Sequence, residues 1–240
     1  MKTQDDGVLH LEIAEYLIKQ IRQGVFSENQ KIPSENDLCR QFQVNRHVVR
    51  QAIARMTNLG WVTPVQGRGC YVNQLVEPIQ YVLSSQTRFS ENMESQGLPY
   101  TAKLLSWEEG IAGDEERANL ELAEGARVYR LEIMRSTDDN PLSVTSTVLP
   151  KEEFPDLETH LTNFSSLYRI FIEQYRFRPI RKKSIVQACL PLLKDAKLLD
   201  IPESVPIVQI ESLMNHPGGA PIEYSVARIR GDRHKYMIEF

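Results

Sequence analysis

Four side chains that can donate hydrogen bonds to phosphates or base edges lie close together near the start of one segment with helical periodicity. They are Arg46, His47, Arg50 and Gln51. The apolar residues of the segment recur at helical spacing and fall on the other side of the helix: Val48, Val49, Ala52, Ile53, Met56 and Leu59. The apolar side is expected to pack inward, which leaves the donors facing out.

The elements that position these donors can be predicted from local signals. Asn45 suits the N-cap of the helix, and Gly60 suits the left-handed position after its last turn. A shorter helix is predicted over residues 34–42, because a Ser-x-x-Asp capping pattern opens it and its apolar residues share one face. Only two residues separate the pair, which is typical of a helix-turn-helix.

Further elements on both sides complete a winged helix-turn-helix. Residues 61–65 and 70–73 read as strands joined by the loop Gln66-Gly67-Arg68-Gly69, and an earlier helix over residues 9–24 should pack across the pair. From Leu38 to Val76 the chain contains no Asp or Glu but contains five arginines, so this stretch would not repel phosphates.

Composition is that of a globular protein, with 41% hydrophobic and 25% charged residues in a chain of 240, long enough for two domains. The net charge of −4 is unevenly divided, since residues 1–73 carry 9 basic and 7 acidic residues and the remainder carries 19 and 25. Contact with a polyanion depends on the electrostatic field near the contacting surface. The negative net charge of the whole chain therefore does not exclude binding to nucleic acid.

Several classes of protein are disfavoured. No apolar run approaches the roughly 18 residues of a membrane span, and no signal peptide is apparent, so we expect a soluble, cytoplasmic protein without membrane contact. The odd, scattered cysteines Cys39, Cys70 and Cys189 are expected to be reduced. No metal-ligand spacing occurs, and we predict neither a metal nor a cofactor.

The remaining chain predicts a second domain. We assign residues 1–73 to the first domain, residues 74–84 to a linker and residues 85–240 to the second. A weak repeat aligns the stretches beginning at Leu120 and Leu199, each reading as a strand, a polar turn and a strand after a short helix. Two such hairpins predict an antiparallel sheet with approximate two-fold symmetry, covered by helices near residues 89–96, 114–122, 165–175 and 192–199. The fold class is therefore α+β.

The run KIPSENDLCRQFQVNRHVVRQAIARMTNLGWVTPVQGRGCYV resembles the N-terminal domain of GntR-family transcriptional regulators. The resemblance implies that Arg46, Arg50 and Gly67 contact double-stranded DNA; otherwise the charges would be a solvated helix face. At residue 36, where many relatives have arginine, this chain has Asn36. The full predicted DNA-binding set is Ser34, Glu35, Asn45, Arg46, His47, Arg50, Gly67 and Arg68.

The second domain is similar to UTRA, the effector-sensing domain of chorismate-lyase-like fold found in the HutC subfamily. The resemblance rests on Arg88-Phe89-Ser90, the hairpin through Arg135 and Pro141, Ser166-Leu167-Tyr168, Glu223-Tyr224-Ser225 and Arg230-Gly231-Asp232-Arg233. Within HutC proteins, NRHVVRQAI, RFSEN and EYS look most like the PhnF-type regulators of phosphonate-utilisation genes.

An anionic effector needs donors that remain effective when buried, and three parts of the chain offer them. Ser165 and Ser166 open a helix whose N-terminus favours anions, Arg135 adds a two-pronged charged contact, and Ser90 adds a hydroxyl. In sugar-phosphate-sensing relatives a second arginine occupies the position of Ile133, which favours a different anion here. The predicted effector-binding set is Arg88, Phe89, Ser90, Arg135, Thr147, Ser165, Ser166, Tyr168, Glu223 and Arg230.

Alternatives remain for individual residues: Arg135 as a surface strand residue, Ser166 as a helix cap only, and Arg230 as the partner of Asp232. The sequence predicts a homodimeric repressor whose small anionic effector, a phosphonate or phosphate ester, controls operator binding. The competing effectors are a sugar phosphate or urocanate. The competing class is a chorismate-lyase-like enzyme, against which no nucleophile and base pair or phosphate-binding loop is found.

Overall fold

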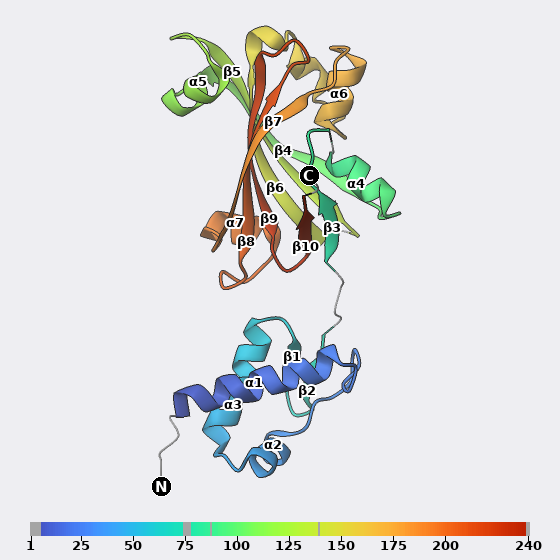
Figure 1. The fold of residues 1–240 in the computed structure, drawn as a ribbon, viewed down its shortest axis with the longest axis vertical. Coiled ribbons are helices and arrows are strands. Elements are labelled where there is room, and N and C mark those ends of the chain that lie inside the picture. Colours follow the sequence, from blue (N-terminus) through green and yellow to red (C-terminus); the bar gives the residue numbers. More distant parts are fainter. Residues whose placement is uncertain (1–5, 74–77, 87, 139, 239–240) are drawn as a thin grey trace. The chain divides into compact units, whose positions relative to one another are not determined.

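The computed structural model describes residues 6–73, 78–86, 88–138 and 140–238, and the chain divides into two compact units at Glu77 and Pro78 (Figure 1). Unit 1 contains a helical trio and a hairpin: α1 (Asp6–Arg22), α2 (Glu35–Phe42), α3 (Arg46–Asn58), β1 (Val62–Val65) and β2 (Gly69–Val72). β1 and β2 pair antiparallel, from Val62 opposite Val72 to Val65 opposite Gly69. The predicted winged helix-turn-helix is confirmed.

Local capping explains where the helices of unit 1 begin and end. Ser34 and Asp37 form the complete capping box of α2, and Gln43 closes that helix in the left-handed conformation at φ 55°. Gly60, at φ 74°, follows the last turn of α3 as predicted. Leu59 differs from its predicted role, because it lies past the last helical residue and is 47% exposed.

The core of unit 1 joins α1 to α3 through fully buried aliphatic side chains. Those of α3 are Val48, Val49, Ala52 and Met56; those of α1 are Ile13, Ala14, Leu17 and Ile21; Leu38 of α2 and Val62 and Val72 of the hairpin complete the cluster. Fully burying one such side chain contributes about 1.5–3 kcal/mol. This core fixes the orientation of α3 within the unit and leaves its other face exposed.

Unit 2 is built on a six-stranded antiparallel sheet with the order β4-β5-β6-β9-β8-β7. The hairpins β5-β6 and β8-β9 meet at the centre, and each follows a short helix, so the predicted symmetric sheet is confirmed. The strands are β4 (Thr101–Ile111), β5 (Arg127–Thr137), β6 (Asn140–Pro150), β7 (Ile180–Cys189), β8 (Ile207–Asn215) and β9 (Pro221–Arg230).

Helices cover both faces of this sheet (Figure 1). On one face lie α5 (Asp114–Leu120) and α7 (Leu193–Leu199); on the other lie α4 (Phe89–Ser95), α6 (Leu167–Glu173) and the short 3-10 turns η1 (Lys151–Glu153) and η2 (Leu157–His160). The α6 side contains an aromatic core in which Phe154 and Phe171 stack at 4.7 Å between ring centroids. The helices α4, α5, α6 and α7 lie within the four ranges predicted from sequence, and the 3-10 turns η1 and η2 were not predicted.

A second, two-stranded sheet corrects the predicted linker. The sequence predicts a linker over residues 74–84, yet Ile79–Val82 forms β3, which pairs in parallel with β10 (His234–Met237) near the C-terminus. Residues 74–77 of that predicted linker lie outside the described residues. The strand belongs to unit 2 because its partner strand is contributed by that unit.

Candidate functional site

The exposed face of α3 presents Arg46, His47 and Arg50, all outside the buried cluster of unit 1. The two arginines are held by polar partners on α2. Arg50 Nε donates to both carboxylate oxygens of Glu35 at 3.1 Å, and Arg46 Nε lies 3.4 Å from the same carboxylate. Such half-exposed ion pairs contribute only about 0–1 kcal/mol, so a phosphate or base edge can replace them.

Glu35 and Asn36 accept hydrogen bonds from the arginines and so orient them. Arg46 Nη2 donates to Asn36 Oδ1 at 2.6 Å, so the residue that replaces the family's usual arginine holds a neighbouring one. Glu35 was predicted to bind DNA, but its carboxylate would repel a phosphate and instead neutralises Arg46 and Arg50. The ion pairs show that Glu35 holds both arginines, and its own contact with DNA stays a prediction.

Two other predicted residues have their side-chain oxygens in use as helix caps. Ser34 Oγ accepts from the backbone N–H of Asp37 at 3.3 Å, and Asn45 Oδ1 accepts from that of Val48 at 3.1 Å. Caps of this type contribute about 1 kcal/mol each to stability. Any DNA contact from these residues would use the remaining hydrogen-bonding groups.

The wing is tipped by Gly67 and Arg68. Gly67 has φ 71°, a conformation that favours glycine, and a Cβ added there would meet open space. Arg68 is exposed beside it on the turn between β1 and β2. A backbone without a side chain can approach a groove closely, and the adjacent guanidinium supplies a positive charge for phosphates.

In unit 2, two adjoining cavities lie beside the sheet and share Arg88, Phe89, Arg135 and Tyr168 in their linings. The smaller, which we call the serine cavity, also contains Ser90, Ser165 and Ser166 among its lining residues. The larger, which we call the sheet cavity, is lined further by Tyr81, Leu83, Ser143, Thr145, Arg181, Ile210, Ser212, Glu223, Ser225, Ala227, Ile229, His234 and Tyr236. Eight of the ten residues predicted for the effector therefore come together.

The two arginines shared by the cavities are held by aromatic rings and polar partners. Arg135 donates from Nη1 to Thr145 Oγ1 at 2.8 Å, and its guanidinium lies 5.4 Å from the centroid of Phe89. Arg88 lies 5.3 Å from the centroid of Tyr168, and its side chain is 10% exposed. The interpretation of Arg135 as a surface residue is wrong, because its guanidinium lines both cavities.

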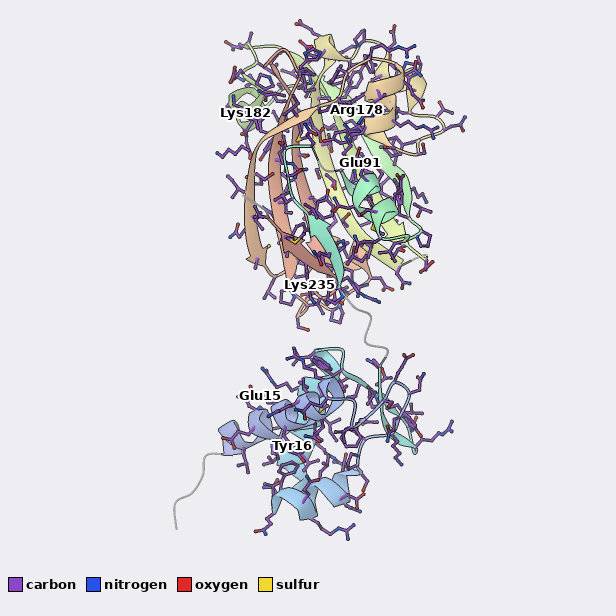
Figure 2. The ribbon with its side chains drawn as sticks, turned by 45° about the vertical axis from the view of Figure 1, so that its right-hand side comes forward. Glu15, Tyr16, Glu91, Arg178, Lys182 and Lys235 are labelled. Atoms are coloured by element: carbon purple, nitrogen blue, oxygen red, sulfur yellow. The ribbon has the colours of Figure 1, made fainter. Side chains whose placement is uncertain are left out.

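Arg88 has a further partner at the rim. Its Nη1 lies 3.3 Å from Glu91, which also lies 3.9 Å from the exposed Arg178 (Figure 2). Arg88 Nε is buried without a hydrogen-bond partner in the described part of the chain. Because an unsatisfied buried donor costs about 1–3 kcal/mol, this atom indicates a place for an acceptor.

Ser166 has the predicted capping role, since its Oγ accepts from the backbone N–H of Arg169 at 3.3 Å. The helix it caps, α6, has only seven residues, so its dipole adds little to anion binding. The positive charge at the serine cavity therefore comes mainly from Arg88 and Arg135, and the serines contribute neutral donors.

Two predicted effector residues lie outside the described linings of both cavities, and we remove them from the site. Thr147 is on β6 two residues beyond Thr145 and is buried opposite Leu131, a member of the aromatic core. Arg230 is engaged in a two-pronged pair with Asp232, at 3.1 and 2.7 Å, as the alternative interpretation of Arg230 predicts.

The structure adds residues that the sequence did not single out, chiefly Arg181 on β7, Tyr81 on β3 and His234 and Tyr236 on β10. Burial lowers the pKa of His234 to about 4, so its imidazole is neutral near pH 7. The place of His234 beside the cavity depends on the parallel pairing of β10 with β3, in which His234 lies opposite Ile79, and nothing local in the sequence marks that pairing.

Burial also determines the charge state of the sheet cavity. It raises the pKa of Glu223, while hydrogen bonds from Tyr168 and Ser225 and the charges of Arg135 and Arg181 oppose that rise. Burial raises the pKa of Tyr168 well above its usual value, so its hydroxyl remains a donor. The cavity thus combines guanidinium donors, hydroxyl donors and one buried carboxyl.

Taken together, a winged helix-turn-helix with exposed arginines and a separate α+β unit with a polar cavity define the class of ligand-responsive DNA-binding regulators. Comparison with known proteins agrees. Residues 9–72 match the family described as bacterial regulatory proteins, gntR family, and residues 95–235 match the UTRA domain.

Individual relatives match nearly the whole chain. It is 34% identical over 236 residues to the probable transcriptional regulator PhnF of Escherichia coli (strain K12), covering 95% of this chain and 92% of that protein. It is 27% identical over 231 residues to the transcriptional repressor NagR of Bacillus subtilis (strain 168), covering 95% and 93%. The crystal structure of PhnF from Mycobacterium smegmatis shares the fold, with a TM-score of 0.63 at 22% identity over 97% of this chain and 98% of that one.

The chain belongs to the GntR family of bacterial regulatory proteins and carries a UTRA domain. It is a DNA-binding transcriptional regulator. The alternative of a chorismate-lyase-like enzyme is excluded, since the family consists of regulators despite the similarity of fold. No helix among the described residues is both long enough and apolar enough to cross a membrane.

Proposed function

We propose that this protein is a repressor that leaves its operator when unit 2 binds a small anion of the phosphonate or phosphate ester class. The observation that carries this proposal is the convergence of Arg88, Arg135, Ser90, Ser165 and Ser166 on one cavity from three parts of the chain. Guanidiniums and hydroxyls bind phosphate-like oxygens without a metal.

The surroundings of Ile133 favour a phosphonate or phosphate ester over a sugar phosphate. The sugar-phosphate-sensing relatives use two arginines, and Ile133 stands at the position of one of them. Ile133 is fully buried in the aromatic core, so this chain has an apolar side chain where those relatives place a cation. The resemblance to PhnF-type regulators of phosphonate-utilisation genes supports a phosphonate. A phosphonate also places its anionic oxygens on a compact head that the serine cavity can surround.

The position of β3 suggests how binding reaches the DNA-binding unit. Tyr81 on β3 lines the sheet cavity, and β3 begins at Ile79, shortly after the boundary between the units. An effector that binds more tightly to one position of β3 would favour one conformation of the segment that joins the two units. Operator release follows when that conformation holds the paired recognition helices away from the ~34 Å spacing of successive major grooves.

A thermal-shift panel tests whether unit 2 binds such anions. 2-Aminoethylphosphonate, inorganic phosphate, glucosamine 6-phosphate and urocanate are compared at 1–10 mM, as rough concentrations for weak ligands. A ligand that prefers the folded state at 100 times its Kd stabilises by about 2.7 kcal/mol, so a clear rise in Tm is expected for the phosphonate. A rise with urocanate alone would contradict the proposed class.

We also propose that the protein acts as a homodimer through the edge strand β7. β7 and the residues after it carry exposed apolar side chains: Ile180, Ile185, Val186, Leu190, Leu192 and Leu193. An unpaired edge strand can pair with a second copy, and antiparallel pairing would place the basic residues Lys182 and Lys183 of the two copies at opposite ends.

Ile185→Lys should therefore weaken the dimer at least tenfold, because burying an ammonium costs more than the ~1.4 kcal/mol that a tenfold change represents. Light scattering on the full chain over a dilution series measures this. Ile111→Lys is the matched control, since Ile111 is also exposed but lies on the opposite edge strand, β4. Equal dimer dissociation constants for Ile185→Lys and Ile111→Lys would exclude β7 as the interface.

A further inference from the structure

The sheet cavity contains two ionisable groups that anion binding in the serine cavity leaves unused, Arg181 and Glu223. Arg181 is near the start of β7, and its Nε and Nη1 are buried without a hydrogen-bond partner among the described residues. Glu223, on β9, is 4% exposed, and its Oε2 likewise has no partner in the described part of the protein. Each group therefore retains unused hydrogen-bonding capacity.

These two groups do not satisfy each other. Within the described ranges, no ion pair within 4.0 Å joins Arg181 to Glu223, although both line the same cavity. A buried polar atom without a hydrogen-bond partner is destabilising even where its residue makes other hydrogen bonds, as Glu223 does with Tyr168 and Ser225. Its retention inside a cavity indicates that a ligand supplies the missing partner. The ligand must offer an acceptor for the guanidinium and a donor for the carboxyl.

One small group offers both within a few bonds. The carboxylate of an α-amino acid can accept two parallel hydrogen bonds from a guanidinium, and its ammonium can donate to a carboxylate. A lone amine would leave the Arg181 donors unsatisfied, and a lone carboxylate would leave Glu223 Oε2 unsatisfied. A group that carries both a carboxylate and an ammonium provides the acceptor for Arg181 and the donor for Glu223 at once.

We propose that Arg181 and Glu223 form a second subsite for an α-amino-acid head group, so that the effector is an α-amino acid whose side chain ends in a phosphonate or phosphate ester. This rests on the proposed function, because the anionic end of the same ligand is held by Arg88, Arg135 and the serines. The two cavities share four lining residues, which allows one ligand to occupy both.

Calorimetry on the full-length wild type tests the subsite with four compounds. 2-Amino-3-phosphonopropanoate and O-phosphoserine carry the complete head group; 2-aminoethylphosphonate lacks the carboxylate, and 3-phosphonopropanoate lacks the amine. We expect the better of the complete compounds to bind at least tenfold more tightly than either incomplete one. Equal affinity of complete and incomplete compounds would overturn the amino-acid assignment while leaving the anion site intact.

Two variants connect each preference to its residue. Arg181→Gln should remove the preference over 2-aminoethylphosphonate, and Glu223→Gln should remove the preference over 3-phosphonopropanoate. Lys182→Gln is the matched control, because Lys182 follows Arg181 on β7, is exposed and is not among the described residues lining either cavity (Figure 2). Unchanged preferences in both cavity variants would overturn the proposal.

Thermal unfolding of each variant identifies loss of the fold, and an unfolded Glu223→Gln would be replaced by Glu223→Asp, which retains the carboxyl but shortens its reach. A reduced preference over 3-phosphonopropanoate in that variant supports the subsite, and an unchanged preference contradicts it. The absence of binding by any of the four compounds would overturn the proposed function as well. Anion binding without head-group preference would overturn the second subsite alone.

Discussion

Arg46→Ala and Arg50→Ala should each weaken operator binding by about 1–3 kcal/mol if each arginine makes a two-pronged contact with a base edge. The physical reason is the loss of paired charge-assisted hydrogen bonds. Removal of either arginine also leaves Glu35 less neutralised, which adds repulsion from the phosphates. Because both arginines share this carboxylate, the double variant should not equal the sum of the single ones.

Fluorescence anisotropy on an operator fragment selected from a random duplex pool measures this prediction, with salt concentration varied. Lys19→Ala is the control, since it removes the same charge from an exposed position on α1. Circular dichroism should be unchanged, because both arginine side chains lie outside the buried cluster of unit 1. If both arginine variants bind the selected operator as tightly as wild type, this face of α3 is not the recognition surface.

Arg135→Ala should raise the effector dissociation constant by roughly ten- to a hundred-fold, since a hydrogen bond to a charged group contributes about 1.5–3 kcal/mol. The guanidinium of Arg135 lines both cavities. Among the described residues that line the serine cavity, Arg88 is the only other cation, so the charge lost with Arg135 is not replaced. DNA binding without effector should be unaffected, because the two functions reside in different units. Arg135→Lys should recover only part of the loss, since an ammonium lacks the planar fork.

Calorimetry with the best ligand of the thermal-shift panel tests this prediction. Arg127→Ala provides a matched control, because Arg127 opens the same strand, β5, is 56% exposed and is outside the described linings of both cavities. The variant must unfold at a midpoint close to that of wild type for the comparison to hold. Equal affinity in wild type and Arg135→Ala would remove Arg135 from the site.

The parts of this protein that were predictable from sequence are those determined by local signals. The boundaries of α2 and α3 follow from Ser34, Asn45 and Gly60, each of which acts within a few residues of itself. The symmetric sheet could be predicted because each repeat forms its own hairpin. A hairpin pairs residues that are close in sequence, and its turn chemistry marks it.

The parts that were missed depend on distant partners. β3 was assigned to the linker because its pairing with β10 is parallel and joins Ile79 to His234, so no turn between them marks it. Arg181 lies on an edge strand whose residues are mostly exposed, and only the tertiary fold reveals that its side chain enters the cavity. The prediction of Thr147 falls on the correct strand, but Thr145 is the residue that contacts Arg135.

The most direct test of the central claim, that an anion in unit 2 controls DNA binding, is the anisotropy of full-length protein on the selected operator during titration with effector. We expect wild type to release DNA at effector concentrations near its Kd, and Arg135→Ala to release it only at concentrations roughly ten- to a hundred-fold higher. Operator affinity that does not change when the effector saturates the wild-type protein would contradict it.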